Sequence, residues 1–142
     1  GKARTRLYEK AIPRGDMNGL LKSLKANRAV WYAPDQDHGI ANSVFVPFFG
    51  NPAATVTSTS RIAAISGARV VPFFQRRLSG RRGYVLELLP ALDNFPGKDI
   101  ASDTARLMRL IESRVRQAPA QYLWAHRRFK TRPPGEPSVY DV

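Results

Sequence analysis

One long amphipathic helix pattern, from about Asp99 to Gln117, restricts the fold of this chain more than any other feature. Apolar side chains recur along it at helical spacing, and charged side chains occupy the rest of its surface. The apolar face holds Ala101, Ala105, Met108, Ile111 and Val115, and outside it lie Arg106, Arg109, Glu112 and Arg116. Because such a helix buries only one stripe, the rest of the chain must provide an apolar surface for it.

Short apolar runs that alternate with helical segments are the candidates for that surface. Three runs are expected to be buried strands: residues 28–34, 68–74 and 83–90. Shorter helices are expected after Asp16, over Ser58–Ser66 with Gly67 at its end, and within residues 119–129. This order predicts the α/β class, with a mixed, largely parallel sheet flanked by helices.

Charge and composition narrow the class of partner. The 142 residues carry 23 basic and 11 acidic side chains, a net charge of +12 and no cysteine. Structural disulfides, thiolate catalysis and cysteine-based zinc sites are therefore excluded for these residues. The positive charge favours a polyanionic partner, such as nucleic acid, an anionic membrane surface or an acidic protein. No apolar run approaches the roughly 18 residues that span a membrane.

Two scarce acids stand together in the stretch VWYAPDQDHG, residues 30–39. Asp35 and Asp37 directly follow an expected strand, and ligands of open α/β sheets bind beyond the carboxyl ends of strands. Two carboxylates there can orient a sugar or a cationic group, or bind a divalent metal. The competing interpretation is a polar turn, in which the aspartates accept hydrogen bonds from nearby backbone N–H groups.

Basic and aromatic side chains give further candidate surfaces. Arg14 stands just before a helix start, where an arginine suits a phosphate or a carboxylate; otherwise it is ordinary surface charge. The basic pairs at 76–77 and 81–82 and the run at 126–130 either grip phosphates or are simply solvated. Phe48 and Phe49 belong to the core, or else line an apolar groove or touch a membrane surface.

Several segments, in matching order and spacing from about Arg14 onward, resemble the lipid A biosynthesis acyltransferases of Gram-negative bacteria, nearest their lauroyltransferase branch. The segments that carry the resemblance are VWYAPDQDHG, SVFVPFFG, ARVVPFF and APAQYLWAHRRFKTRPPGEPSVY. The resemblance implies transfer of a fatty acyl chain from acyl carrier protein to a lipid A precursor, in lipopolysaccharide biosynthesis. It also implies a location at the cytoplasmic face of the inner membrane, an anionic membrane surface as a further partner, and no cofactor or metal. The fold that the resemblance implies is similar to that of the glycerolipid acyltransferases.

The same resemblance implies that the catalytic base lies outside this chain. The family uses a His-x4-Asp/Glu dyad, in which the histidine takes a proton from the acceptor hydroxyl. Five positions after His38 and His126 stand Ser43 and Thr131, so neither histidine forms such a pair. Residues 1–142 are therefore expected to be the C-terminal portion of a single acyltransferase domain, inactive alone, with residues 131–142 as an extended tail.

Three later family motifs map onto this sequence as substrate-binding candidates. Arg14 matches the arginine of the second motif, which is linked to acceptor binding. The third motif corresponds to Asp35, Gln36, Asp37 and Gly39. Glycerolipid enzymes carry Glu-Gly-Thr-Arg there for a phosphate, whereas acids replace the arginine here, so the aspartates are expected to orient Arg14, the upstream histidine or the glucosamine portion. Pro72 matches the fourth motif, which shapes the acyl pocket.

Two other functions are compatible with the residues taken alone. A basic nucleic-acid-binding module fits the charge and the aromatic side chains, although no basic helix, zinc pattern or RNP-type strand is present and nucleic acid is not the expected partner. A Mg²⁺-dependent enzyme that handles sugars or phosphoryl groups through Asp35 and Asp37 is the second.

Overall fold

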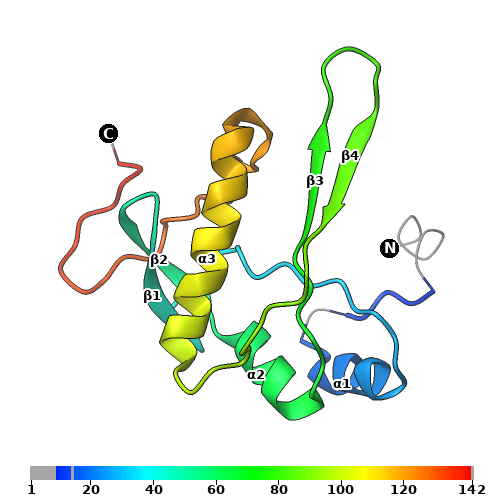
Figure 1. The fold of residues 1–142 in the computed structure, drawn as a ribbon. Helices are drawn as coiled ribbons and strands as arrows, with labels where there is room; N and C mark the ends of the chain where they lie inside the picture. Colours follow the sequence, from blue (N-terminus) through cyan, green and yellow to red (C-terminus); the bar gives the residue numbers. More distant parts are fainter. Residues whose placement is uncertain (1–8, 14, 142) are drawn as a thin grey trace. The chain divides into compact units, whose positions relative to one another are not determined.

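The computed structural model describes residues 9–13 and 15–141, and the chain divides into two compact units, Gly1–Tyr32 and Ala33–Val142. In the first unit, helix α1 spans Met17–Lys25 (Figure 1). The Asp16 carboxylate accepts a hydrogen bond from the backbone N–H of Gly19 at 2.8 Å, which caps the helix as expected. Leu20 is buried on its apolar face.

The expected strand at residues 28–34 does not form. A strand needs a hydrogen-bonded neighbour, and no described residue pairs with this segment. Its largest side chain, Trp31, is 71% exposed instead of buried. The apolar pattern is real, but the described residues contain no strand that pairs with it.

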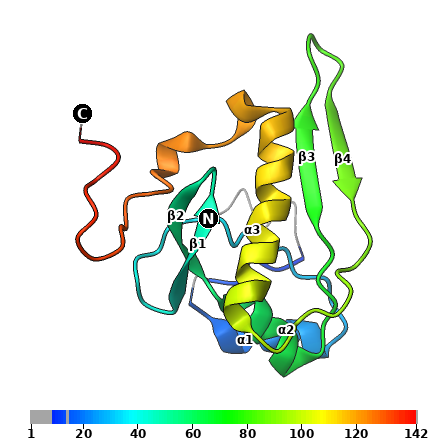
Figure 2. The same ribbon diagram turned by 60° about the vertical axis from the view of Figure 1, so that its left-hand side comes forward.

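Every strand found among the described residues lies in the second unit, together with the long helix (Figure 2). Its elements are β1 Ser43–Phe48, β2 Asn51–Val56, α2 Ser58–Ser66, β3 Phe73–Arg77, β4 Tyr84–Leu88, α3 Ile100–Gln117, and the 3-10 turns η2 Pro119–Gln121 and η3 Trp124–His126. The predicted helices α2 and α3 are confirmed, and Gly67 ends α2 in a left-handed conformation. The single short helix expected within residues 119–129 is replaced by the two 3-10 turns.

The sheets are not parallel, so that part of the predicted fold class is wrong for the described residues. Strands β1 and β2 form one antiparallel pair and β3 and β4 form another. Phe49 and Gly50 alone connect β1 to β2, and both have positive φ, 50° and 78°. A two-residue turn of that kind reverses the chain into a hairpin. A parallel pair would need a crossover of a dozen residues or more.

The β1–β2 hairpin was not predicted because its segment contains two prolines. Pro47 and Pro52 lie directly opposite each other in the antiparallel register. Because Phe48 and Asn51 close the turn as a hydrogen-bonded pair, the proline pair next to them occupies a position that needs no N–H from either residue. The prolines are therefore compatible with the ladder and do not interrupt it.

The second hairpin begins later than expected. Strand β3 starts at Phe73 and includes Arg76 and Arg77, which were expected to lie in the connecting loop. Beyond the strand ends, the backbone N–H of Leu92 donates to the carbonyl of Val70 at 2.9 Å, so a looser pairing extends toward the predicted start.

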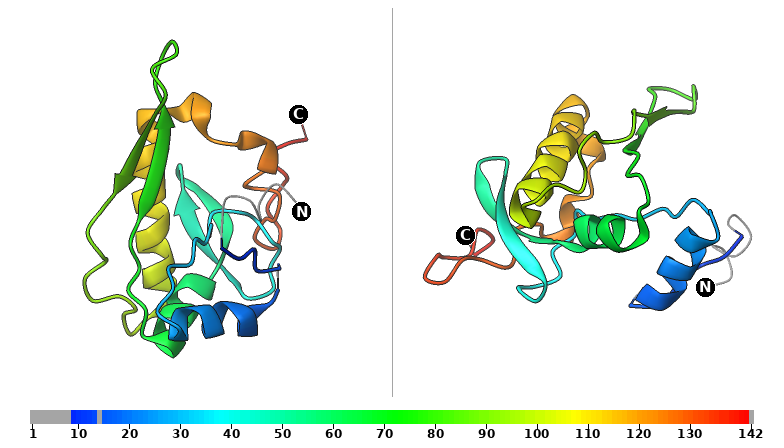
Figure 3. Two further views of the ribbon diagram at one scale, coloured as in Figure 1. Left: turned by 90° about the vertical axis from the view of Figure 1, so that its right-hand side faces the viewer. Right: turned by 60° about the horizontal axis from the view of Figure 1, so that its bottom comes forward.

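The core lies between α3 and the β1–β2 hairpin (Figure 3). Its buried members are Val46, Phe48, Ala53, Met108 and Val115. The predicted apolar face of α3 thus packs on a sheet, and Phe48, fully buried, belongs to the core and does not touch a membrane surface.

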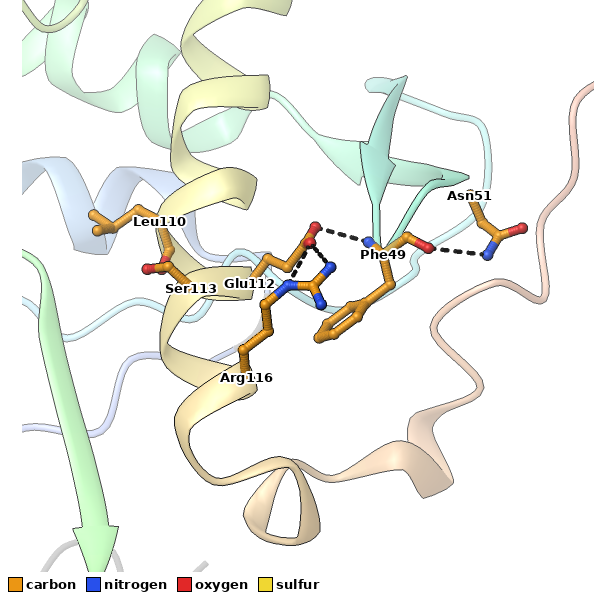
Figure 4. Close-up of polar contacts among 6 residues, drawn as sticks. All are labelled: Phe49, Asn51, Leu110, Glu112, Ser113 and Arg116. Carbon is orange, nitrogen blue, oxygen red and sulfur yellow. Dashed lines mark hydrogen bonds and ion pairs between the residues drawn. The ribbon is translucent and has the colours of Figure 1, made fainter.

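A side chain of helix α3 also binds the β1–β2 turn through a polar contact (Figure 4). The Glu112 carboxylate accepts the backbone N–H of Phe49 at 2.7 Å and binds the Arg116 guanidinium at 2.6 Å. Burial would raise the pKa of Glu112, but these two contacts outweigh it and lower the pKa below its ordinary value. The charged carboxylate therefore stabilises an aromatic residue held in a strained left-handed conformation.

Candidate functional site

The acidic loop, residues 35–39, is bound by a second segment, residues 122–131, which lies about ninety residues later in the chain. We call this second segment the closing segment. Three hydrogen-bonded contacts join the two: Thr131 to Asp37, Tyr122 to Asp35, and Gln36 to His126. Both segments belong to the second unit. The two most distinctive sequence motifs of the chain therefore form one structure.

Asp37 is the centre of this arrangement and is only 4% exposed. One carboxylate oxygen accepts the backbone N–H of Gly39 at 2.9 Å and the hydroxyl of Thr131 at 2.8 Å. The other accepts the backbone N–H of Thr131 at 2.9 Å. Three donors satisfy this buried carboxylate, so it anchors the loop to the closing segment. The expected local turn, Asp37 to Gly39, is present as one part of a longer-range contact.

Arg128 fixes the closing segment to the sheet from the core side. Only 1% of it is exposed, and its guanidinium donates to the carbonyl of Ala54 at 2.7 Å and to the Thr55 hydroxyl. The guanidinium also lies 5.6 Å from the centre of the Phe48 ring. Burial lowers the pKa of Arg128, whereas the charge of Asp37 among others raises it. Arg128, although part of the basic run at 126–130, therefore links the closing segment to the β1–β2 hairpin inside the protein and is not a solvent-facing phosphate ligand.

Tyr122 closes the other end of the acidic loop. Its hydroxyl donates to the main-chain oxygen of Asp35 at 3.4 Å, and its ring packs against Trp124 and Phe48. Burial, followed by the negative charge of Asp35, raises the pKa of Tyr122 well above its ordinary value. The hydroxyl therefore stays protonated and acts as a hydrogen-bond donor.

The solvent-facing side of the arrangement is polar and basic. The Gln36 amide lies 3.4 Å from the exposed His126 ring, and Arg127 and Lys130 are also exposed. Asp35 and Gln36 are half-buried, so a ligand can reach their side chains. Gly39 ends the loop with φ of +87°, a backbone conformation that side-chain-bearing residues rarely adopt.

The other predicted site residues are not part of this cluster. Pro72 lies just before β3, where its carbonyl accepts the N–H of Leu89 at 3.0 Å, and no hydrogen bond joins it to the acidic loop within the described residues. Arg14 lies outside the described residues.

No local signal in the sequence indicated that Tyr122 and Thr131 hold the loop, and Arg128 was expected at the surface as part of the basic run at 126–130. All three residues lie in the segment APAQYLWAHRRFKTRPPGEPSVY, which carries the family resemblance. Nothing in the residue types separated a buried arginine from its exposed neighbours.

Metal ligation and membrane insertion can be examined only for the part of the chain that the structure describes. Within residues 9–13 and 15–141, no three histidine or acidic side chains gather as a metal site would need. None of the helices described there has both the length and the apolar character to cross a bilayer.

The chain is similar to one protein family over nearly its whole length. Residues 2–131 match the family model described as bacterial lipid A biosynthesis acyltransferase. A lauroyltransferase of lipid A biosynthesis from Escherichia coli (strain K12) is 45% identical over 138 residues, 96% of this chain and 45% of that protein. A palmitoleoyltransferase from the same organism is 39% identical over 140 residues, 98% of this chain and 45% of that protein.

A third relative extends the comparison to another acyl chain. A lipid A biosynthesis myristoyltransferase from Escherichia coli (strain K12) is 32% identical over 121 residues, which is 85% of this chain and 38% of that protein. The chain thus spans less than half the length of these curated relatives.

Proposed function

Because this chain belongs to the bacterial lipid A biosynthesis acyltransferase family, we propose that it is the C-terminal portion of an enzyme that transfers a fatty acyl chain from acyl carrier protein to a lipid A precursor. The observation that supports this most directly is the joining of the acidic loop to the closing segment through the buried Asp37. A loop held this firmly keeps its reachable side chains in fixed positions, which is what substrate orientation requires.

The two aspartates have different roles in this proposal. Asp37 is a positioning residue, because its carboxylate is buried and fully used by Gly39 and Thr131. Asp35 and Gln36, which are half-buried at the open side, bind the glucosamine portion of the acceptor through its hydroxyl groups. Asp37 therefore acts through the loop, and Asp35 and Gln36 act on the substrate.

The positive charge of the chain fits the partners in this proposal. Acyl carrier protein, the phosphates of a lipid A precursor and an anionic membrane surface are all negative, and the chain carries a net charge of +12. Arg127 and Lys130 stand exposed within the closing segment. They meet the anionic groups of the acceptor while the acidic loop orients its neutral hydroxyls.

The remaining assignments rest on the family pattern. The general base is a His-x4-Asp/Glu dyad in the part of the full-length enzyme outside residues 1–142, at the cytoplasmic face of the inner membrane. Arg14 binds the acceptor, and Pro72 shapes the acyl pocket. In the complete domain, helices flank the sheet as in the glycerolipid acyltransferases, and residues 131–142 form its tail.

The test is acyl transfer by the full-length enzyme, with an acyl carrier protein thioester as donor and a lipid A precursor as acceptor. We expect product to form with EDTA present, because acyl transfer needs a base and an oxyanion stabiliser and involves no phosphoryl group. No transfer to the lipid A precursor would contradict the proposal. Activity that EDTA abolishes and Mg²⁺ restores would favour a metal-dependent role for Asp35 and Asp37.

A further inference from the structure

The β3–β4 hairpin carries a row of apolar side chains on the face turned away from α3. In its antiparallel register, Phe73 lies opposite Leu88, Gln75 opposite Leu86 and Arg77 opposite Tyr84, so these six side chains share one face, which we call the outer face. Leu88 is 69% exposed, Tyr84 68%, Leu86 62% and Phe73 39%. No other sheet face among the described residues presents so many exposed large apolar side chains.

The opposite face of the same hairpin is already used. Phe74 and Glu87 lie opposite each other there, and Arg114 of α3 contacts both. Its guanidinium is 5.5 Å from the centre of the Phe74 ring and 3.3 Å from the Glu87 carboxylate. Figures 1 and 3 show the hairpin running beside α3, with its tip projecting past the end of the helix. Helix α3 therefore contacts the inner side of the hairpin at Phe74 and Glu87, while Val85 on the same side stays 39% exposed.

An isolated two-stranded hairpin is marginally stable at best, and this one receives support from α3 on its inner side only. Alternating exposed leucines indicate that this face is built to be covered. Lipid is a poor cover, because the hairpin is a two-stranded sheet whose outer edges have no strand neighbour among the described residues. Immersing such edges in hydrocarbon would leave backbone N–H and carbonyl groups without partners. A helix laid on the face leaves the edges accessible to water or to another strand.

We propose that the outer face is an internal interface of the full-length enzyme, covered by an apolar helix from the part of the protein outside residues 1–142. This rests on the proposed function, in which the chain is one portion of a larger domain. Curated relatives carry more than half of their length outside the matched region, which is ample for such a helix. Three arginines lie near the tip of the hairpin: Arg77 on the outer face, and Arg81 and Arg82 beside it. They favour a covering helix with carboxylates at the end that meets this tip.

Single cysteines test the cover directly, since residues 1–142 contain no cysteine of their own. In full-length enzyme with any cysteines elsewhere replaced, Leu86→Cys and Leu88→Cys are labelled with a maleimide. Ser79→Cys, at the exposed tip of the same hairpin, is the matched control. We expect labelling at 86 and 88 to be at least about tenfold slower than at 79, because a covered thiol reacts only when the structure opens locally.

The outcomes separate the possible covers. Equal rates at all three positions would overturn the proposal, and so would slow labelling at 86 and 88 that depends on added vesicles of anionic phosphatidylglycerol. Hydroxyl-radical footprinting of Tyr84 in the unmodified enzyme repeats the test without a substitution, and low reactivity is expected there. Acyl transfer is assayed separately, so loss of the proposed function and loss of this interface give different results.

Discussion

At the scale of single residues, the structure separates two aspartates that the sequence presents as a pair. Asp37→Asn places an amide N–H against donors from Gly39 and Thr131, whereas the Tyr122 hydroxyl donates to the main-chain oxygen of Asp35. We expect Asp37→Asn to lower the free energy of unfolding of the full-length enzyme by about 1–3 kcal/mol. Asp35→Asn should change it by less than about 0.5 kcal/mol. Urea denaturation measures both.

Activity should show the converse pattern for Asp35. In the full-length enzyme, Asp35→Asn is expected to lower kcat/KM for acyl transfer by at least about tenfold while leaving stability unchanged. Thr131→Val is the control for the positioning role of Asp37. It removes the hydroxyl donor to the Asp37 carboxylate, while the backbone N–H of residue 131 still donates to that carboxylate. If Asp35→Asn and Asp37→Asn reduced stability equally, the separate roles would be wrong.

Arg14 is the third residue whose role is open to test. The full-length Arg14→Ala variant should lose at least about tenfold in kcat/KM, the scale of one charge-assisted contact with the acceptor. Arg14→Lys should recover little of that loss if the contact is planar and bidentate. Kinetics of Arg14→Ala equal to those of the unchanged enzyme would leave Arg14 as surface charge.

At the scale of elements, the stabilisation that the contact between Glu112 of α3 and the β1–β2 turn provides should depend on pH. The folded-state pKa of Glu112 is lowered, so its contribution is complete above the ordinary carboxyl pKa and is lost as the pH falls through the folded-state value. Glu112→Gln should lower stability by about 1–2 kcal/mol near pH 7, since a charged acceptor for the N–H of Phe49 is removed. The difference between variant and unchanged enzyme should shrink as the pH falls through the folded-state pKa of Glu112, which lies below its ordinary carboxyl value.

Urea midpoints collected from pH 7 to pH 3 provide this comparison. Asp99, whose pKa its hydrogen bonds with Ser102 also lower, is present in both proteins and therefore cancels in the difference. A difference that stayed constant with pH would show that Glu112 acts through its packing and not through its charge.

Helices were predictable from the sequence because their signals are local. The Asp16 cap, the Gly67 end and the spacing along α3 each depend on residues within a few positions of one another. Strand pairing is not local. The stretch at residues 28–34 has a strand pattern without a described partner, and the β1–β2 hairpin depends on two prolines that lie opposite each other. The acidic loop was found, but its partner Thr131 follows Asp37 by 94 positions.

At the scale of the whole molecule, the 142-residue chain alone is expected to show no acyl transfer. Its histidines at 38 and 126 lack the acid five positions on that a His-x4-Asp/Glu dyad requires. The measurement is turnover of acyl carrier protein thioester with a lipid A precursor, beside the full-length enzyme as positive control. Turnover above background by the 142-residue chain would place the catalytic base within it and refute the division of roles proposed above.

The long separation between Asp37 and Thr131 also fixes an order of events on the ribosome. Chain growth of about 5–20 residues per second puts roughly 5–19 s between the synthesis of these two residues, since 94 positions separate them. Helix α3 and both hairpins have their sequences complete within that interval. The acidic loop therefore acquires its anchor after every other element of its unit has been made, and a chain that ends before residue 131 lacks that anchor.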